Sequence, residues 1–178
     1  QAGAAEVGIC GGYQMLGRRI SDPAHVESAE DAVEGLALLP QETLFQGDKE
    51  THQAQARLKW TTGWLAPLYG QMIAGYEIHM GRTGGGGNWL EIERRGDRPV
   101  QVPDGGMSAD GRVWGCYLHG LFENDALRRA WLRSLGWQPE QEPAGGWRAS
   151  YQAAFDRLAD VVESALDMAQ IDRLIGLD

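Results

Sequence analysis

The chain has 178 residues, 43% of them hydrophobic, and a formal net charge of −9 at pH 7. This length and apolar content suffice for one substantial core, so we expect a single domain over residues 1–178. An acidic chain lacks the basic face that a nucleic acid requires, and we find neither a membrane-spanning run nor a signal peptide. We therefore expect no nucleic-acid or membrane partner and a cytoplasmic location, where the two cysteines stay reduced.

The first expected elements are a short apolar strand over residues 4–9 and a helix over residues 12–18. Cys10 lies at the turn between them, flanked by Gly8 and Gly11. Small neighbours permit the sharp, strained turn that presents a nucleophile. Because amide groups at a helix start favour a thiolate and stabilise an oxyanion, Cys10 is the candidate nucleophile and the Gly11 N–H a candidate oxyanion donor. Glycines around a buried cysteine also suit close packing of a strand on a helix.

The middle of the chain alternates between polar connections and strands. Residues 19–34 are polar and contain a proline, which predicts a surface connection. Residues 54–60 alternate strictly, as a strand with one solvent-facing side does, and shorter patterns predict strands at residues 89–93 and 98–102. The glycine run at residues 84–87 predicts a flexible connection and not a phosphate cradle, because no Lys-Ser or Lys-Thr pair and no helix start follow it.

The last part of the chain predicts a strand and two helices. Residues 113–118 are rich in strand-forming side chains, with His119 at the carboxyl end, and Asn124 predicts the N-cap of the next helix. Residues 136–146 contain the glycines and prolines of a loop. Beyond them, apolar residues at helical spacing predict one long amphipathic helix; they are Tyr151, Phe155, Leu158, Val162, Leu166 and Ala169.

A thiol needs a nearby base at neutral pH, and His119 is the best candidate. Sites of open α/β sheets gather at the carboxyl ends of parallel strands, which would bring His119 and Cys10 to one edge. A strand-end histidine that caps a turn is the alternative. Cys116 points to the opposite strand face, so we expect it to be buried and unreactive. His25 and His52 lie in polar stretches, which predict solvated loops, and the His and Cys spacing predicts no metal site.

Three segments carry a resemblance to a known family. They are Val7-Gly-Ile-Cys-Gly-Gly-Tyr-Gln-Met-Leu-Gly17, Gly75-Tyr-Glu-Ile-His-Met-Gly-Arg-Thr83 and Trp114-Gly-Cys-Tyr-Leu-His-Gly-Leu-Phe-Glu-Asn124. With residues 35–43, they closely resemble the glutamine amidotransferase domains of cobyric acid synthases over nearly the whole chain. The resemblance implies a class I glutamine amidotransferase-like, flavodoxin-like α/β fold with an open, largely parallel sheet flanked by helices. It also implies an N-terminally incomplete domain that follows an ATP-dependent synthetase domain.

In such a domain Cys10 would attack the side-chain amide of glutamine and release ammonia through a glutamyl thioester, with His119 as the base. The resemblance implies that the synthetase domain uses the ammonia, with ATP and magnesium, to amidate corrin carboxylates and convert adenosylcobyrinic acid a,c-diamide to cobyric acid. It implies no cofactor within this domain. Candidate oxyanion or substrate-binding residues are Gly11, Gly12, Gln14, Tyr76, Glu77, His79 and Gly81, although a histidine like His79 is more often a packing residue.

One position departs from many related amidotransferases. They carry a glutamate two positions after the histidine, where this chain has Leu121; the cobyric acid synthase branch also lacks it. Glu123 is a nearby candidate for orienting the imidazole, although an acid at a helix start is the alternative. Rival enzymes are the amidotransferases of cobyrinic acid a,c-diamide synthase and of a peptidoglycan-precursor amidating enzyme. The missing acid also leaves open a non-catalytic module that docks on a synthetase.

Overall fold

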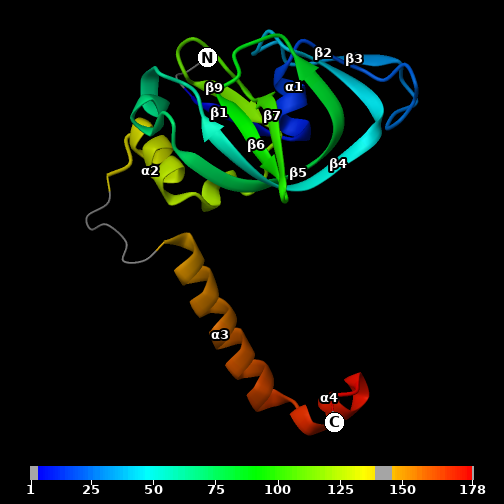
Figure 1. Cartoon of the computed structure of the whole chain (residues 1–178), viewed down its shortest axis with the longest axis vertical. Helices are drawn as coiled ribbons and strands as arrows, with labels where there is room; N and C mark the ends of the chain where they lie inside the picture. The colour runs from blue at the N-terminus through cyan, green and yellow to red at the C-terminus, as the bar shows by residue number, and fades with distance from the viewer. Residues whose placement is uncertain (1–3, 139–145, 178) are drawn as a thin grey trace. The chain divides into compact units, whose positions relative to one another are not determined.

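The computed structural model of the chain describes residues 4–138 and 146–177 (Figure 1). Its internal contacts divide the chain into two compact units, residues 1–138 and 139–178. The second unit contains α3 (Trp147–Ala165) and α4 (Met168–Ile175). The first unit contains β1 (Glu6–Ile9), α1 (Gly11–Leu16), β2 (Arg19–Ser21), β3 (Ala32–Glu34), β4 (Glu42–Leu58), η1 (Gly63–Leu68), β5 (Met72–Gly84), β6 (Leu90–Arg95), β7 (Arg98–Asp104), β8 (Gly106–Met107), β9 (Val113–Cys116), η2 (Leu121–Glu123) and α2 (Asp125–Ser134).

The strands of the first unit form two sheets. A three-stranded sheet has the order β1-β9-β8, in which β1 and β9 are parallel and β8 is antiparallel to β9. A six-stranded sheet has the order β3-β2-β4-β6-β7, with β5 paired to β4 outside this path. In that sheet β2 and β4 are parallel, and the other pairs are antiparallel. The predicted α/β class is therefore confirmed.

The prediction of a largely parallel sheet is wrong for the strands that the structure describes. Parallel neighbours need a crossover connection of a dozen residues or so. Only Gly96 and Asp97 join β6 to β7, so these two strands can pair only as an antiparallel hairpin. Strands β4 and β5 form a long antiparallel ladder that curves strongly (Figure 1).

Tryptophans form the centre of the first unit's core. Trp89 and Trp114 are fully buried, and the Trp114 ring lies 5.1 Å from that of Trp64 and 5.0 Å from that of Trp131, centroid to centroid. The Trp89 indole N–H donates to the Gly115 carbonyl oxygen at 2.9 Å. Because large aromatic rings dominate the energetics of a core, this cluster fixes β9 firmly. The position of the residues that follow β9 is thereby set.

The segment between α1 and β4 is not the plain surface connection that its polar sequence predicts. It contains β2 and β3, whose three residues each are too few for alternation to show. Between these strands Asp22 is buried, and its carboxylate accepts backbone N–H bonds from Val26, Glu27 and Ser28, each at 2.8 Å. A buried carboxylate therefore organises this segment.

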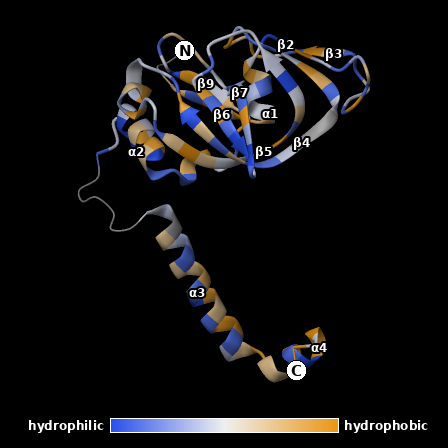
Figure 2. Cartoon of the chain, in the orientation of Figure 1, coloured by the Kyte–Doolittle hydropathy of each residue, from blue (hydrophilic) through white to orange (hydrophobic). Residues whose placement is uncertain are grey.

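The second unit has two helices where the apolar spacing predicts one. Helix α3 ends at Ala165, and α4 begins at Met168. Between them Asp167 has extended backbone angles, and its side chain accepts the Gln170 N–H at 3.1 Å. Asp167 is thus the N-cap of α4, and its non-helical backbone separates α4 from α3. Figure 2 shows apolar and polar residues interspersed along α3.

Most other expected elements lie close to their predicted positions. The strand predicted at residues 54–60 is the end of the longer β4, and α2 begins directly after Asn124. His52 lies within β4 and not in the predicted loop. Most of the loop predicted at residues 136–146 lies outside the described residues. Within the described ranges, no helix has the length and apolar character needed to cross a membrane.

Candidate active site

Cys10 occupies the turn between β1 and α1 in a strained backbone conformation. Its φ of 55° and ψ of −116° are rare for any residue with a side chain, and such strain, about 1–3 kcal/mol, is concentrated at functional sites. Gly8 makes the turn possible, because a Cβ there would lie 2.6 Å from the carbonyl carbon of Gly12. The predicted sharp turn is therefore confirmed. The backbone of Gly12 packs closely against Gly8 in this turn.

His119 lies just beyond β9, the parallel neighbour of β1. Ile9 and Cys116 are partners in this pair, and the Cys10 N–H donates to the Cys116 carbonyl oxygen at 3.0 Å. Both strands therefore end at the same edge of the sheet, as we expected. At that edge β1 is followed by Cys10, and β9 is followed three residues later by His119. Cys116 itself is fully buried, as predicted.

Strand β5 passes both residues. The Cys10 thiol donates to the Ile78 carbonyl oxygen at 3.4 Å. The backbones of His119 and Tyr76 exchange two hydrogen bonds, at 2.8 Å from the His119 N–H and 3.2 Å from the Tyr76 N–H. Because alternate residues of a strand are about 7 Å apart, the thiol and the imidazole flank one short stretch of β5.

The electrostatic surroundings shift the pKa values of both groups in the direction that favours their neutral forms. Burial raises the pKa of the Cys10 thiol, and the hydrogen bond from the Gly11 backbone opposes this only in part. The Gly11 amide thus acts in the direction we expected, but burial outweighs it. Burial, followed by the charge of His79, lowers the pKa of His119. In the part of the chain that the structure describes, His119 Nε2 is buried and has no hydrogen-bond partner, so no protein group competes for this nitrogen.

The sequence candidate for orienting His119, Glu123, does not bind its ring. Glu123 is exposed and makes no hydrogen bond to His119 among the described residues, and Leu121, at the position of the missing acid, is buried in the core. The ring instead stacks on the Tyr76 ring, with the centroids 4.9 Å apart and the planes 13° from parallel. Tyr76, predicted to contact substrate, thus lies directly beside the candidate base.

Glu77 and His79 point to the opposite face of β5, where they belong to a buried charged cluster. Arg95 donates two hydrogen bonds to the Glu77 carboxylate, at 2.7 and 2.9 Å, and His79 Nε2 lies 3.3 Å from it. Although burial opposes it, these partners lower the pKa of Glu77. His79 Nδ1 also lies 2.9 Å from the Gly81 carbonyl oxygen. The structure therefore brings Glu77 and His79 together, and the polar groups predicted to contact substrate are within hydrogen-bond distance of each other.

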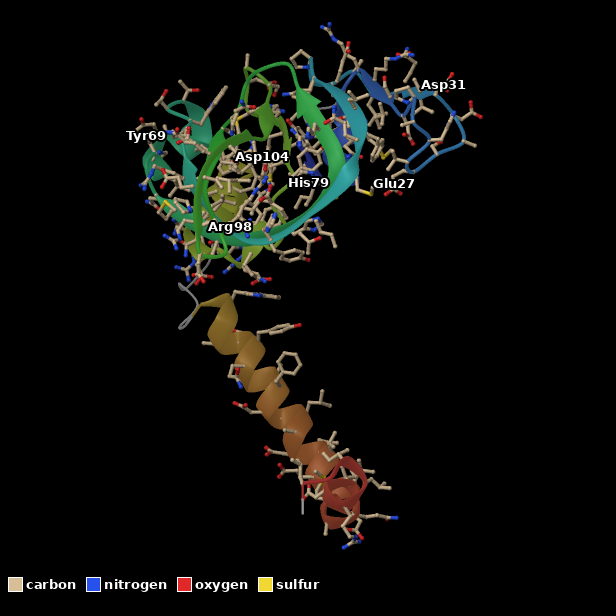
Figure 3. The ribbon with its side chains drawn as sticks, turned by 45° about the vertical axis from the view of Figure 1, so that its right-hand side comes forward. Glu27, Asp31, Tyr69, His79, Arg98 and Asp104 are labelled. Carbon is tan, nitrogen blue, oxygen red and sulfur yellow. The ribbon has the colours of Figure 1, made fainter. Side chains whose placement is uncertain are left out.

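Asp104, at the end of β7, completes this cluster. Burial raises its pKa to about 6, although N–H bonds from Tyr117 and Gly105 work in the opposite direction. Figure 3 shows Asp104 and His79 within the curve of the sheet, where both line a cavity of about 280 Å³. Asp104 was not predicted, because a single acid after a strand carries no signal of its own.

Gln14 and Gly81 join the elbow helix to β5. The Gln14 side-chain amide donates to the Tyr117 hydroxyl at 3.2 Å, and that hydroxyl lies 2.7 Å from Thr83 Oγ1. A Cβ on Gly81 would lie 2.5 Å from Gln14 Nε2, so only glycine leaves room for this arrangement. The His79 ring stacks on Tyr117 with centroids 3.9 Å apart. Sequence reasoning missed Tyr117, although it lies within the third quoted segment.

A second cavity lies beside α1. It has a volume of about 290 Å³, and Gly11, Gln14, Met15 and Phe45 form part of its wall. Gly11 and Met15 are exposed and Phe45 is partly buried, so the cavity borders the first turn of α1. Among residues 4–138 and 146–177, no group of three or more His, Cys, Asp or Glu side chains is placed to hold a metal ion.

A strained cysteine elbow, a histidine at the end of the adjacent parallel strand and a mixed α/β fold define a class I glutamine amidotransferase-like protein. Comparison with known proteins agrees. Residues 1–127 match the family model described as a CobB/CobQ-like glutamine amidotransferase domain, and the chain belongs to this family.

Relatives from several bacteria have the same name. The chain is 51% identical to the cobyric acid synthase of Chloroflexus aurantiacus, over 96% of this chain and 34% of that protein. It is 39% identical to the cobyric acid synthase of Moorella thermoacetica, over 99% and 35%, and 42% identical to that of Rhizobium meliloti, over 98% and 33%. The chain thus spans about a third of the length of these relatives.

Proposed function

We propose that the chain is the glutamine-hydrolysing part of a cobyric acid synthase, with Cys10 as the nucleophile and His119 as the base. The observation that carries the proposal is the strained Cys10 turn at the same sheet edge as an imidazole whose Nε2 has no partner within the described chain. A domain that only binds a partner gains nothing from such strain. The similarity to cobyric acid synthases over almost the whole chain favours this branch over the two rival amidotransferases.

The reaction begins with neutral groups. The Cys10 sulfur attacks the side-chain carbonyl carbon of glutamine while its proton passes to the His119 imidazole. A C–S bond forms, and the carbonyl oxygen becomes an oxyanion that the Gly11 N–H stabilises. The imidazolium then donates its proton to the amide nitrogen, the C–N bond breaks, and ammonia leaves a glutamyl thioester. Water attacks the thioester with His119 again as the base, which releases glutamate and restores the thiol.

The cavity beside the elbow is the proposed place of glutamine. Gly11 and Gln14 border it, so a substrate there lies next to the proposed oxyanion donor. Its volume of about 290 Å³ admits an amino acid. Tyr76, Glu77, His79 and Gly81, predicted as substrate contacts, belong to strand β5, and the last three line the other cavity, of about 280 Å³. Their contact with glutamine stays a prediction.

The destination of the ammonia is the part of the proposal that reaches beyond this chain. A synthetase region of the full-length protein would use ATP and magnesium to activate corrin carboxylates and amidate them with the ammonia, converting adenosylcobyrinic acid a,c-diamide to cobyric acid in the cytoplasm. The support is the name of relatives three times as long as the chain. We assign no cofactor to the amidotransferase part itself.

Covalent labelling tests the nucleophile directly. The full-length synthase is treated with a glutamine-mimicking diazoketone, and the cysteine peptides are compared by mass spectrometry. We expect the label on Cys10, protection by excess glutamine, and none on Cys116, which is fully buried and whose pKa burial raises well above its usual value. The Cys10→Ser variant is the control and should remain unlabelled. Labelling of Cys116, or no protection by glutamine, would overturn the assignment.

A further inference from the structure

No hydrogen-bonded carboxylate holds the His119 imidazole in the described part of the chain. A catalytic imidazole must be held in one plane and stabilised while it carries the extra proton, which in many triads is the work of a hydrogen-bonded carboxylate. In the described part of the chain, the buried Nε2 of His119 has no hydrogen-bond partner, and Leu121 occupies the position where related enzymes carry a glutamate. Another group must therefore fix the ring.

The Tyr76 ring is the group in contact with it. The two rings are nearly parallel, 13° apart, at a centroid distance of 4.9 Å. Tyr76 is 42% exposed, so its ring is not part of the core. An exposed aromatic side chain gains little from packing alone, which makes a flat stack on the candidate base informative.

The backbone around Tyr76 is built to hold this stack. Besides the reciprocal bonds between Tyr76 and His119, the Asn124 side chain accepts the Ala74 N–H at 3.0 Å and donates to the Ala74 carbonyl oxygen at 2.8 Å. Gly75 permits this close approach, because a Cβ there would lie 2.2 Å from the His119 carbonyl oxygen. Two successive contacts thus lock this part of β5 to the segment that carries His119.

We propose that Tyr76 is the positioning residue of His119: its ring face fixes the imidazole plane and stabilises the imidazolium that forms when Cys10 loses its proton. The negative face of an aromatic ring attracts a cation stacked on it, so the ring supplies both functions of an orienting carboxylate. The hydroxyl group takes no part. This inference rests on the proposed glutaminase function and names the group that replaces the missing acid.

The test compares Tyr76→Phe and Tyr76→Leu in the full-length synthase, with Tyr69→Leu, an exposed tyrosine away from the site (Figure 3), as the matched control. Glutamine-dependent and ammonia-dependent amidation are measured for each. Since a positioned general base contributes about 10²–10⁴-fold, we expect Tyr76→Leu to lower kcat with glutamine at least about tenfold, with KM nearly unchanged. Tyr76→Phe should keep both constants, and the ammonia reaction should be unaffected in every variant.

Each other outcome is informative. Full glutamine activity of Tyr76→Leu would overturn the inference. Equal losses of kcat in Tyr76→Phe and Tyr76→Leu would also overturn it, because they would assign the role to the hydroxyl. A change confined to KM would overturn it by assigning Tyr76 to substrate binding. If Tyr76→Leu also loses the ammonia reaction, Tyr76→Met replaces it in the comparison with Tyr76→Phe. If His119→Asn keeps full glutamine activity, the proposed function itself fails, whatever Tyr76 does.

Discussion

Asp104 offers a quantitative test of the buried cluster behind the elbow. Its carboxylate accepts N–H bonds from Gly105 at 2.6 Å and from Tyr117 at 3.0 Å, and Tyr117 in turn binds Gln14 of the elbow helix. Burial raises the pKa of Asp104 to about 6. We predict that Asp104→Asn, which is neutral at every pH and keeps an acceptor oxygen, changes how stability depends on pH.

The sign follows from proton binding. An unfolded aspartate has a pKa of about 3.9, so between about pH 4 and pH 6 the folded state holds a proton that the unfolded state has lost. The stability of the unaltered protein therefore falls as pH rises through this range. Because one unit of pKa difference corresponds to about 1.4 kcal/mol, the loss is about 3 kcal/mol. Asp104→Asn has no titrating carboxyl at this position and should not show this loss of stability.

Urea unfolding, followed by the fluorescence of the buried tryptophans, measures the effect. The free energy of unfolding of Asp104→Asn minus that of the unaltered protein should increase by about 3 kcal/mol from pH 4 to pH 7.5. Asp110→Asn is the control, because the hydrogen bond from Ser108 lowers the pKa of Asp110 and its difference should change with the opposite sign. A difference for Asp104→Asn that is constant across this range would refute the reasoning.

Three further predictions follow from single contacts. Gly75→Ala places a Cβ 2.2 Å from the His119 carbonyl oxygen, so glutamine-dependent kcat should fall about 10²-fold while ammonia-dependent amidation stays, whereas Gly47→Ala, which has open space, should match the unaltered enzyme. Arg95→Met removes two hydrogen bonds from the buried Glu77 carboxylate and should lower the free energy of unfolding in urea by about 3 kcal/mol; no change would contradict the buried pairing. Asp167→Ala removes the N-cap of α4 and should destabilise this helix by about 1 kcal/mol, seen as faster amide exchange there than in α3.

The elbow could be predicted from the sequence because its signals are local. Glycines on both sides of Cys10, an apolar strand before it and a helical pattern after it all lie within a dozen residues. The meeting of Cys10 with His119 needed only one further rule, that parallel strands end at a common edge. The strained turn at Cys10 and the common edge of β1 and β9 are both found in the structure, and a direct contact between Cys10 and His119 stays a prediction.

The supporting residues could not be predicted, since they depend on strand register. Glu77 meets Arg95 only because β4 pairs with both β5 and β6, and no spacing within one strand indicates this. The Tyr76 stack on His119 likewise joins segments more than forty residues apart. The break at Asp167 was missed for a different reason, because the apolar spacing continues through a residue whose side chain caps a new helix.

The most direct test of the account is the nitrogen-donor dependence of His119→Asn in the full-length synthase, with His25→Ala as the control histidine on an exposed turn. Ammonia bypasses the thioester chemistry but still requires the synthetase reaction. The account predicts that His119→Asn loses amidation with glutamine and keeps the full rate with free ammonia, while His25→Ala keeps both. Equal loss with the two nitrogen donors, or full activity with glutamine, would contradict the role of His119 as the base for Cys10.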